Sequence, residues 1–173
     1  MANISGLVEE HAGTSRERLA ERLSAACYGT VLVLVALPLI NADEVSTGTG
    51  WELVTGVGVA TWLAHLYAEV AGDHVRRGSA VDRAGITRAM VDGLPIPLAA
   101  VLPAIVLFLG RVEVLDPRVA LWIAVAVAIG QLVGLGAFVG GTVSRRGASV
   151  WTYAGATAVI GIVVVSLKLA LGH

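Results

Sequence analysis

The sequence predicts an all-α integral membrane protein, a bundle of about five transmembrane helices with a cytoplasmic N-terminus and an extracytoplasmic C-terminus. Of its 173 residues, 56% are hydrophobic and only 14% are charged, and the mean hydropathy is +0.80. Soluble domains carry about 25% charged residues, so this chain has too few to cover a soluble surface. Its apolar residues also form segments of about 20, the length at which a helix crosses the hydrocarbon core. Strand-like alternation is absent, which favours helices over a membrane barrel.

Composition and charge exclude several classes of protein. A net charge of −1 excludes a strongly basic nucleic-acid binder, and the high apolar content excludes a disordered chain. A single cysteine excludes an intrachain disulfide framework and a multi-cysteine metal site. We therefore expect a multi-pass protein of the cell membrane whose main partner is the lipid bilayer, with no nucleic acid bound.

Residues 1–23 precede the first span and are expected to form a charged cytoplasmic helix. The stretch 14–17 (Thr-Ser-Arg-Glu) fits a capping box, which predicts that this helix begins at Thr14. The helix is expected to continue into a first span over residues 24–41. A cleaved signal peptide is the rival interpretation, but Ile40 stands where the cleavage site would need a small residue.

Four further spans complete a single transmembrane domain over residues 24–172; they are predicted at residues 51–71, 91–110, 119–143 and 150–171. A cytoplasmic loop over residues 73–90 joins the second span to the third. Within this loop, Ser79 and Asp82 resemble the start of a further helix.

The third span carries three prolines, Pro95, Pro97 and Pro103. Prolines are tolerated in the first turn of a helix, so they favour a kinked helix start. The alternative is a broken helix whose exposed carbonyls coordinate ions, as in transporters. Asp92 directly precedes these prolines and is expected to cap the helix.

Basic residues predict the orientation. Nine of the twelve fall on one side of the five-span arrangement: Arg16, Arg18, Arg22, Arg76, Arg77, Arg83, Arg88, Arg145 and Arg146. The other three, Arg111, Arg118 and Lys168, fall on the opposite side. Because cytoplasmic loops are enriched in Lys and Arg, the N-terminus is expected in the cytoplasm and His173 outside. A cytoplasmic His173 would instead indicate four spans and a re-entrant third segment.

The second span carries the candidate transport site. Trp62, His65 and Glu69 are spaced i, i+3 and i+7, which places them on one helix face. His65 lies roughly 6 Å and Glu69 roughly 12 Å from the midpoint of the span, at a rise of 1.5 Å per residue. An ionisable pair at this depth suits a proton relay or a cation site. The alternative is structural, with His65 bonded to a neighbouring helix and Glu69 paired with a loop arginine.

The sequence assigns no metal ion to this site. Two ligands, His65 and Glu69, are too few for a zinc ion. His74 or a second protomer would have to complete the coordination.

The fourth span is rich in small residues. One helix face carries Gly130, Gly134, Ala137 and Gly141, a pattern that lets helices approach closely. This face is expected either to pack within the bundle or to form a homodimer interface. Gln131 is the strongly polar residue of this span and is a candidate for a hydrogen bond between helices.

The layout resembles that of small polytopic proteins of the bacterial inner membrane, with the likeness carried by residues 24–30 and 62–69. It also distantly resembles the vacuolar iron transporter family. Tyr67-Ala68-Glu69 falls where that family's second span ends in a Gly-Glu-Tyr-like motif. The resemblance implies five spans, an inner N-terminus, a homodimer and a role for Glu69. Unlike that family, this chain has no Asp or Met in its first span.

No phosphate-binding loop, catalytic motif or cofactor fingerprint occurs in the sequence, so we expect no enzyme activity and no cofactor. Two functions stay open. The first is a transporter or channel for a proton or a small cation. The second is a non-transporting membrane scaffold or partner subunit, in which the polar groups only join helices.

Overall fold

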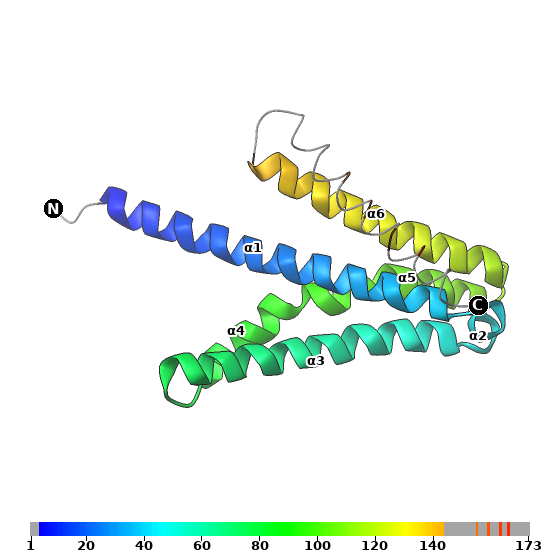
Figure 1. Ribbon diagram of the computed structural model, residues 1–173, viewed down its shortest axis with the longest axis horizontal. Helices are drawn as coiled ribbons and strands as arrows, with labels where there is room; N and C mark the ends of the chain where they lie inside the picture. The colour runs from blue at the N-terminus through cyan, green and yellow to red at the C-terminus, as the bar shows by residue number, and fades with distance from the viewer. Residues whose placement is uncertain (1–3, 144–154, 156–158, 160–162, 164–165, 167–173) are drawn as a thin grey trace.

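A computed structural model describes residues 4–143 together with Gly155, Val159, Val163 and Ser166, and side chains from Glu17 to Gly141 and at those four positions. The described chain consists of helices joined by short connections, with no strand among the described residues (Figure 1). Its elements are α1 (Ile4–Ala36), η1 (Leu37–Leu39), α2 (Ala42–Thr47), α3 (Thr49–Arg77), α4 (Arg83–Gly93), α5 (Pro95–Arg111) and α6 (Pro117–Val143).

Four stretches of the described chain are long and apolar enough to cross a membrane. They are Glu17–Leu39, Thr49–Arg77, Arg83–Arg111 and Pro117–Gly141, and they coincide with the first four predicted spans. This confirms an all-helical bundle of membrane character. The predicted fifth span, residues 150–171, lies almost entirely outside the described residues; the four residues described there are helical.

The prediction that a helix begins at Thr14 is wrong. Helix α1 begins at Ile4 and runs without interruption through Thr14 to Ala36. The residues before Thr14 include Leu7, Glu9 and Glu10, which are good helix formers. The backbone N–H groups after Thr14 therefore find carbonyl partners in the preceding turn, and the capping motif is not needed.

The predicted loop 73–90 is mostly helical. Helix α3 continues to Arg77 and ends at Gly78, whose φ of 63° is the left-handed conformation that glycine adopts readily. Helix α4 then begins after Asp82, whose carboxylate accepts a hydrogen bond from the backbone N–H of Gly85 at 2.9 Å. A helix start in this segment is therefore confirmed, but its cap is Asp82 and not Ser79, which lies in the turn before the helix.

The third predicted span is divided between α4 and α5. Pro95 occupies the first position of α5 and Pro97 lies in its first turn, in agreement with the expected kinked start. The prediction that Asp92 caps this helix is wrong, because Asp92 lies in the last turn of α4. Leu94, the single residue between the two helices, keeps helical dihedrals, so there is no open helix start at Asp92 to cap.

Helix α5 is the centre of the bundle and contacts α1, α3 and α6. The core is built from small and branched side chains, among them Val33, Leu34, Val54 and Leu107, which are fully buried. Glycine allows the closest approach: a Cβ added at Gly29 of α1 would lie 2.7 Å from the backbone oxygen of Ile96. Such contacts between small residues are the usual means by which membrane helices associate.

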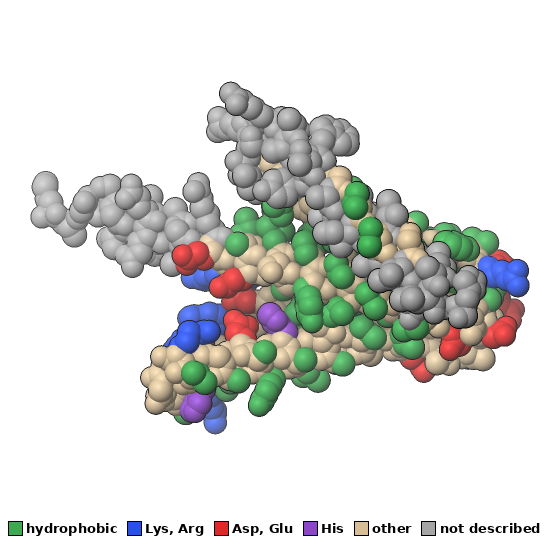
Figure 2. Space-filling model, in the orientation of Figure 1, with side chains coloured by type: hydrophobic (Ala, Val, Ile, Leu, Met, Phe, Trp, Pro, Cys, Tyr) green, Lys and Arg blue, Asp and Glu red, His purple; other side chains and the backbone are tan. Residues whose placement is uncertain are grey.

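The two ends of the bundle differ. Helix α2 and the α5–α6 connection lie at one end, where the helices are close together (Figure 1). At the other end, α1, the α3–α4 hairpin and α6 diverge, and charged side chains gather between α1 and α3 (Figure 2). Between α1 and α3, the second end is therefore the more charged of the two in the view of Figure 2.

Candidate functional site

The candidate face of α3 is turned toward α4. The indole N–H of Trp62 donates a hydrogen bond to the backbone oxygen of Met90 at 3.2 Å. A Cβ added at Gly93 would lie 3.1 Å from Cδ1 of Trp62 and 3.5 Å from Cδ2 of His65. The absence of a side chain at Gly93 thus allows Trp62 and His65 to lie directly against the end of α4.

His65 and Glu69 are neighbours on α3. Nε2 of His65 lies 3.8 Å from Oε2 of Glu69, one helical turn further along. Both side chains are partly exposed, at 41% and 37%. Among the described side chains, His65 has no ion-pair partner on another helix; its ring packs against Gly93 of α4, and it shares a common space with Glu69.

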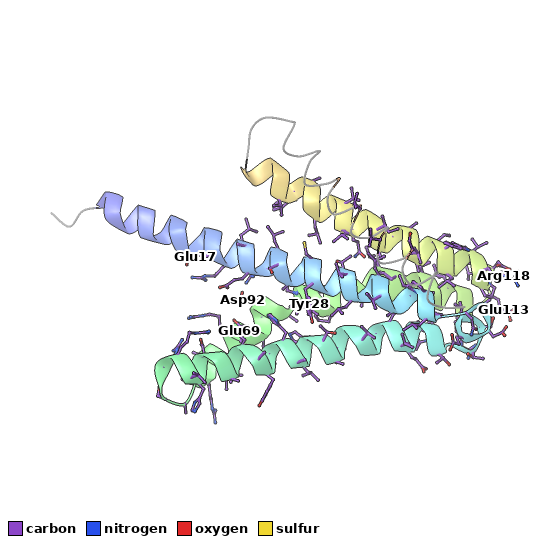
Figure 3. All side chains as sticks on the ribbon, in the orientation of Figure 1. Glu17, Tyr28, Glu69, Asp92, Glu113 and Arg118 are labelled. Atoms are coloured by element: carbon purple, nitrogen blue, oxygen red, sulfur yellow. The ribbon has the colours of Figure 1, made fainter. Side chains whose placement is uncertain are left out.

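This common space is a pocket of about 420 Å³ between α1, α3 and α4, which we term the acidic pocket. Helix α1 contributes residues spaced by three and four positions, which lie on one face. The lining residues are Glu21, Ser24, Ala25 and Tyr28 of α1, His65 and Glu69 of α3, and Asp92 of α4. The pocket therefore collects three carboxylates and one imidazole, and Figure 3 shows Tyr28, Glu69 and Asp92 converging between these helices.

Asp92 is the buried member of this group. Its side chain is 9% exposed and lies 3.0 Å from the guanidinium of Arg22 on α1. A buried carboxylate is costly unless it is paired and hydrogen-bonded, and Nε of Arg22 supplies that hydrogen bond. Sequence reasoning missed this pair because it treated Arg22 as a topology signal. The available signal was that Asp92 is the one acidic residue in the predicted span 91–110.

The expected pairing of Glu69 with a loop arginine is not found. Arg76 and Arg77 both bond the carboxylate of Asp73, which is closer to them on the same helix. Ion pairs between residues three or four positions apart form readily on a helix surface, so Asp73 pairs with both of these arginines. Glu69 therefore has His65 as its ionisable neighbour and lines the acidic pocket.

Metal binding finds no support in the part of the chain that the structure describes. No group of three or more His, Cys, Asp or Glu side chains lies close enough together there to hold an ion. His74, considered as a third ligand, is exposed near the end of α3. The acidic pocket is thus a spread of charges and not a compact coordination site.

Gln131 is not part of the acidic pocket. It lies with Gly134 in a separate, largely apolar pocket of about 480 Å³ between α1, α5 and α6, lined also by Ala26, Thr30, Pro95, Leu98, Ala99, Leu135 and Phe138. Oε1 of Gln131 is buried and has no hydrogen-bond partner within the described residues. The structure therefore separates Gln131 from Trp62, His65 and Glu69.

The small-residue face of α6 has no close neighbour in the described chain. A Cβ added at Gly130, Gly134 or Gly141 would meet no described atom within 4 Å. Ala137, on the same face, is half-buried. Gly130 and Gly141 therefore make no close approach to another described helix, and Gly134 borders the apolar pocket between α1, α5 and α6.

No protein-family model, curated protein or solved structure matches this chain. The resemblance to the vacuolar iron transporter family accordingly stays a prediction from residues 67–69. The functional argument rests on the geometry of the site itself.

Proposed function

We propose that this protein is a small multi-pass transporter or channel that moves protons or a small cation through the membrane. The observation that carries the proposal is the acidic pocket, which gathers three carboxylates and one imidazole between three helices. Carboxylates lining a passage attract cations and repel anions, which gives such a site its selectivity.

His65 and Glu69 are proposed to hold and pass the proton. Their 3.8 Å separation is longer than a direct hydrogen bond, and a small rotation of either side chain or one water molecule closes it. Histidine is the side chain whose unperturbed titration falls in the physiological range. Glu21 on α1 extends the acidic lining, while Asp92 is neutralised by Arg22.

We place the acidic pocket on the cytoplasmic side of a cell membrane, with five spans and an outer C-terminus. Support comes from the arginines, which cluster at the pocket's end of the bundle and are sparse at the other. An adjoining pocket is lined by Arg18, Arg22, Arg83 and Arg88. Arg111 ends α5 and Arg118 lies in the first turn of α6, at the opposite end of the bundle, where Figure 3 labels Arg118.

A homodimer is part of the proposal, with one acidic pocket in each protomer, because that pocket is lined by α1, α3 and α4. The face of α6 with Gly130 and Gly134, open within the described chain, is the proposed contact. Cysteines introduced at these two positions, in a Cys27→Ser background, should form disulfide crosslinks between protomers in lipid. A protein that stays monomeric at every protein-to-lipid ratio would refute the dimer.

The decisive experiment is ion flux into proteoliposomes, followed with an internal pH dye under an imposed potassium diffusion potential. Proton flux should fall about tenfold or more in His65→Ala and in Glu69→Gln, as for the loss of a positioned proton-transfer group. His74→Ala and Glu52→Gln are the matched controls, because both change the same residue types on α3 outside the pocket. Parallel assays with sodium and potassium gradients identify the cation.

A scaffold or partner subunit is the second candidate function. The observation that favours it is the set of contacts joining the pocket walls, Arg22 to Asp92 and Trp62 to Met90. Native protein that carries no proton, sodium or potassium flux, combined with lower stability on breaking either contact, would select the scaffold. Proton flux that survives His65→Ala unchanged would remove His65 from the mechanism.

A further inference from the structure

A second pocket adjoins the acidic pocket and shares Asp92 with it, and its charge is opposite to that of the acidic pocket. It encloses about 600 Å³ between α1 and α4, and we term it the basic pocket. Its lining residues are Arg18 and Arg22 of α1, and Arg83, Ala84, Thr87, Arg88, Val91 and Asp92 of α4. Four guanidinium groups from two helices thus face one space that contains a single carboxylate.

The positive charge of this pocket is largely uncompensated. Asp92 is engaged by Arg22 at 3.0 Å. Among the side chains that the structure describes, Arg18, Arg83 and Arg88 have no carboxylate partner within ion-pair distance, whereas Arg76 and Arg77 are both paired with Asp73. Planar guanidinium groups that lack carboxylates suit a phosphate, whose oxygens accept their paired hydrogen bonds.

The apolar pocket beside Gln131 lies further along α1 than the basic pocket. Arg18, Arg22, Ala26 and Thr30 follow one another at four-residue intervals on α1; the first two line the basic pocket and the last two line the apolar pocket beside Gln131. These four positions span about 18 Å along the axis of α1, at 1.5 Å per residue.

The helices that face α1 across these two pockets also change from charged to apolar residues. Helix α4 contributes Arg88 and Val91 to the basic pocket, and α5 contributes Pro95 and Leu98 to the apolar pocket. Leu98 is 59% exposed, as expected for a side chain that meets an apolar ligand or lipid. The two pockets thus follow one another along α1 and along α4–α5, the charged one first and the apolar one next, and we term them together the groove.

We propose that this groove binds an anionic phospholipid, with its phosphate among the four arginines and an acyl chain along the α1 and α5 side of the apolar pocket, beside Ala26 and Leu98 and away from Gly134 of α6. A free phosphate ion would use only the basic half and leave the apolar continuation without a role. Basic pockets between membrane helices at the cytoplasmic side are suited to anionic lipid headgroups. The ligand is therefore a molecule in which a phosphate and a hydrocarbon chain are joined.

Binding is tested with purified protein in neutral detergent, by native mass spectrometry or fluorescence titration. The probes are phosphatidylglycerol, phosphatidylcholine, glycerol phosphate and inorganic phosphate. Phosphatidylglycerol should bind about tenfold or more tightly than phosphatidylcholine, because its headgroup carries no compensating cation. It should also bind far more tightly than glycerol phosphate, which has the headgroup chemistry without the acyl chains.

Three double variants distinguish a specific binding site from nonspecific attraction of the anionic lipid to positive charge. Arg83→Gln with Arg88→Gln should weaken phosphatidylglycerol binding about tenfold or more, since two charge-assisted contacts are lost. Arg76→Gln with Arg77→Gln removes the same charge from the same end of the molecule but outside the pocket, and should leave affinity nearly unchanged. Arg83→Lys with Arg88→Lys keeps the charge, supports folding, and should lose affinity because lysine lacks the planar fork.

Three results would overturn the proposal. Equal loss of binding in the pocket and control double variants would show that attraction is diffuse. Equal binding of glycerol phosphate or inorganic phosphate would show a site for a soluble anion, with the apolar pocket occupied by other protein. Unchanged phosphatidylglycerol binding in the lysine variant would show that the guanidinium geometry plays no part.

Discussion

The guanidinium of Arg22 lies 3.0 Å from the carboxylate of Asp92, although 70 positions separate the two residues in the chain. Asp92 lines both the acidic and the basic pocket, and Arg22 lines the basic one. This pair therefore forms the wall between two spaces of opposite charge and joins α1 to α4 at that point.

The first prediction concerns this pair. In Arg22→Gln, Asp92 keeps its buried carboxylate and loses its cation, so stability should fall by about 1–3 kcal/mol, the cost of an unsatisfied buried group. Thermal unfolding in detergent, followed by tryptophan fluorescence, measures the loss. The double variant with Asp92→Asn removes both charges and should recover most of it. A double variant no more stable than Arg22→Gln alone would contradict the coupling.

The second prediction concerns the contact between α1 and α5. In Gly29→Ala the new Cβ meets the backbone oxygen of Ile96, which cannot rotate away, so stability should fall by about 1–3 kcal/mol. Gly56→Ala is the matched control, because its Cβ meets no described atom within 4 Å. It should be neutral or stabilise the helix by up to about 1 kcal/mol. Equal effects at the two positions would argue against the close approach.

The third prediction concerns Trp62. Replacement by phenylalanine keeps most of the ring and removes the N–H that bonds the Met90 oxygen, so about 1 kcal/mol of stability should be lost. Trp122→Phe serves as the control, since Trp122 is 63% exposed on α6. Thermal unfolding curves are compared for the two variants. Similar unfolding midpoints would show that the hydrogen bond from the Trp62 indole contributes nothing to stability.

The fourth prediction concerns orientation. In a Cys27→Ser background, cysteine at Val114 should react with a membrane-impermeant maleimide on intact cells, because Val114 lies at the end of the bundle assigned to the outside. Cysteine at Ser79, between α3 and α4, should react only after the membrane is opened. The reverse pattern would invert the topology. A reporter fused at His173 tests the fifth span separately and should be extracytoplasmic.

Local patterns predicted much of the fold. Each of the first four predicted spans overlaps one observed stretch, although the observed stretches begin or end up to eight residues away from the predicted bounds. The face shared by Trp62, His65 and Glu69 follows from helical spacing. Helix starts and caps predicted from local motifs were wrong where the preceding residues continued a helix. Thr14 was expected to start a helix but lies inside α1, and Asp92 was expected to cap a helix but lies at the end of α4.

Composition and periodicity by themselves determined that this chain is helical, that it suits a membrane, and which residues share a helix face. Those properties depend on the solvent and on residues within one or two turns. Only the tertiary structure decided that Arg22 pairs with Asp92, that His65 lies against Gly93, and that an acidic and a basic pocket lie side by side. These contacts join helices that are distant in the chain, and their geometry is set by how closely glycine and alanine let those helices approach.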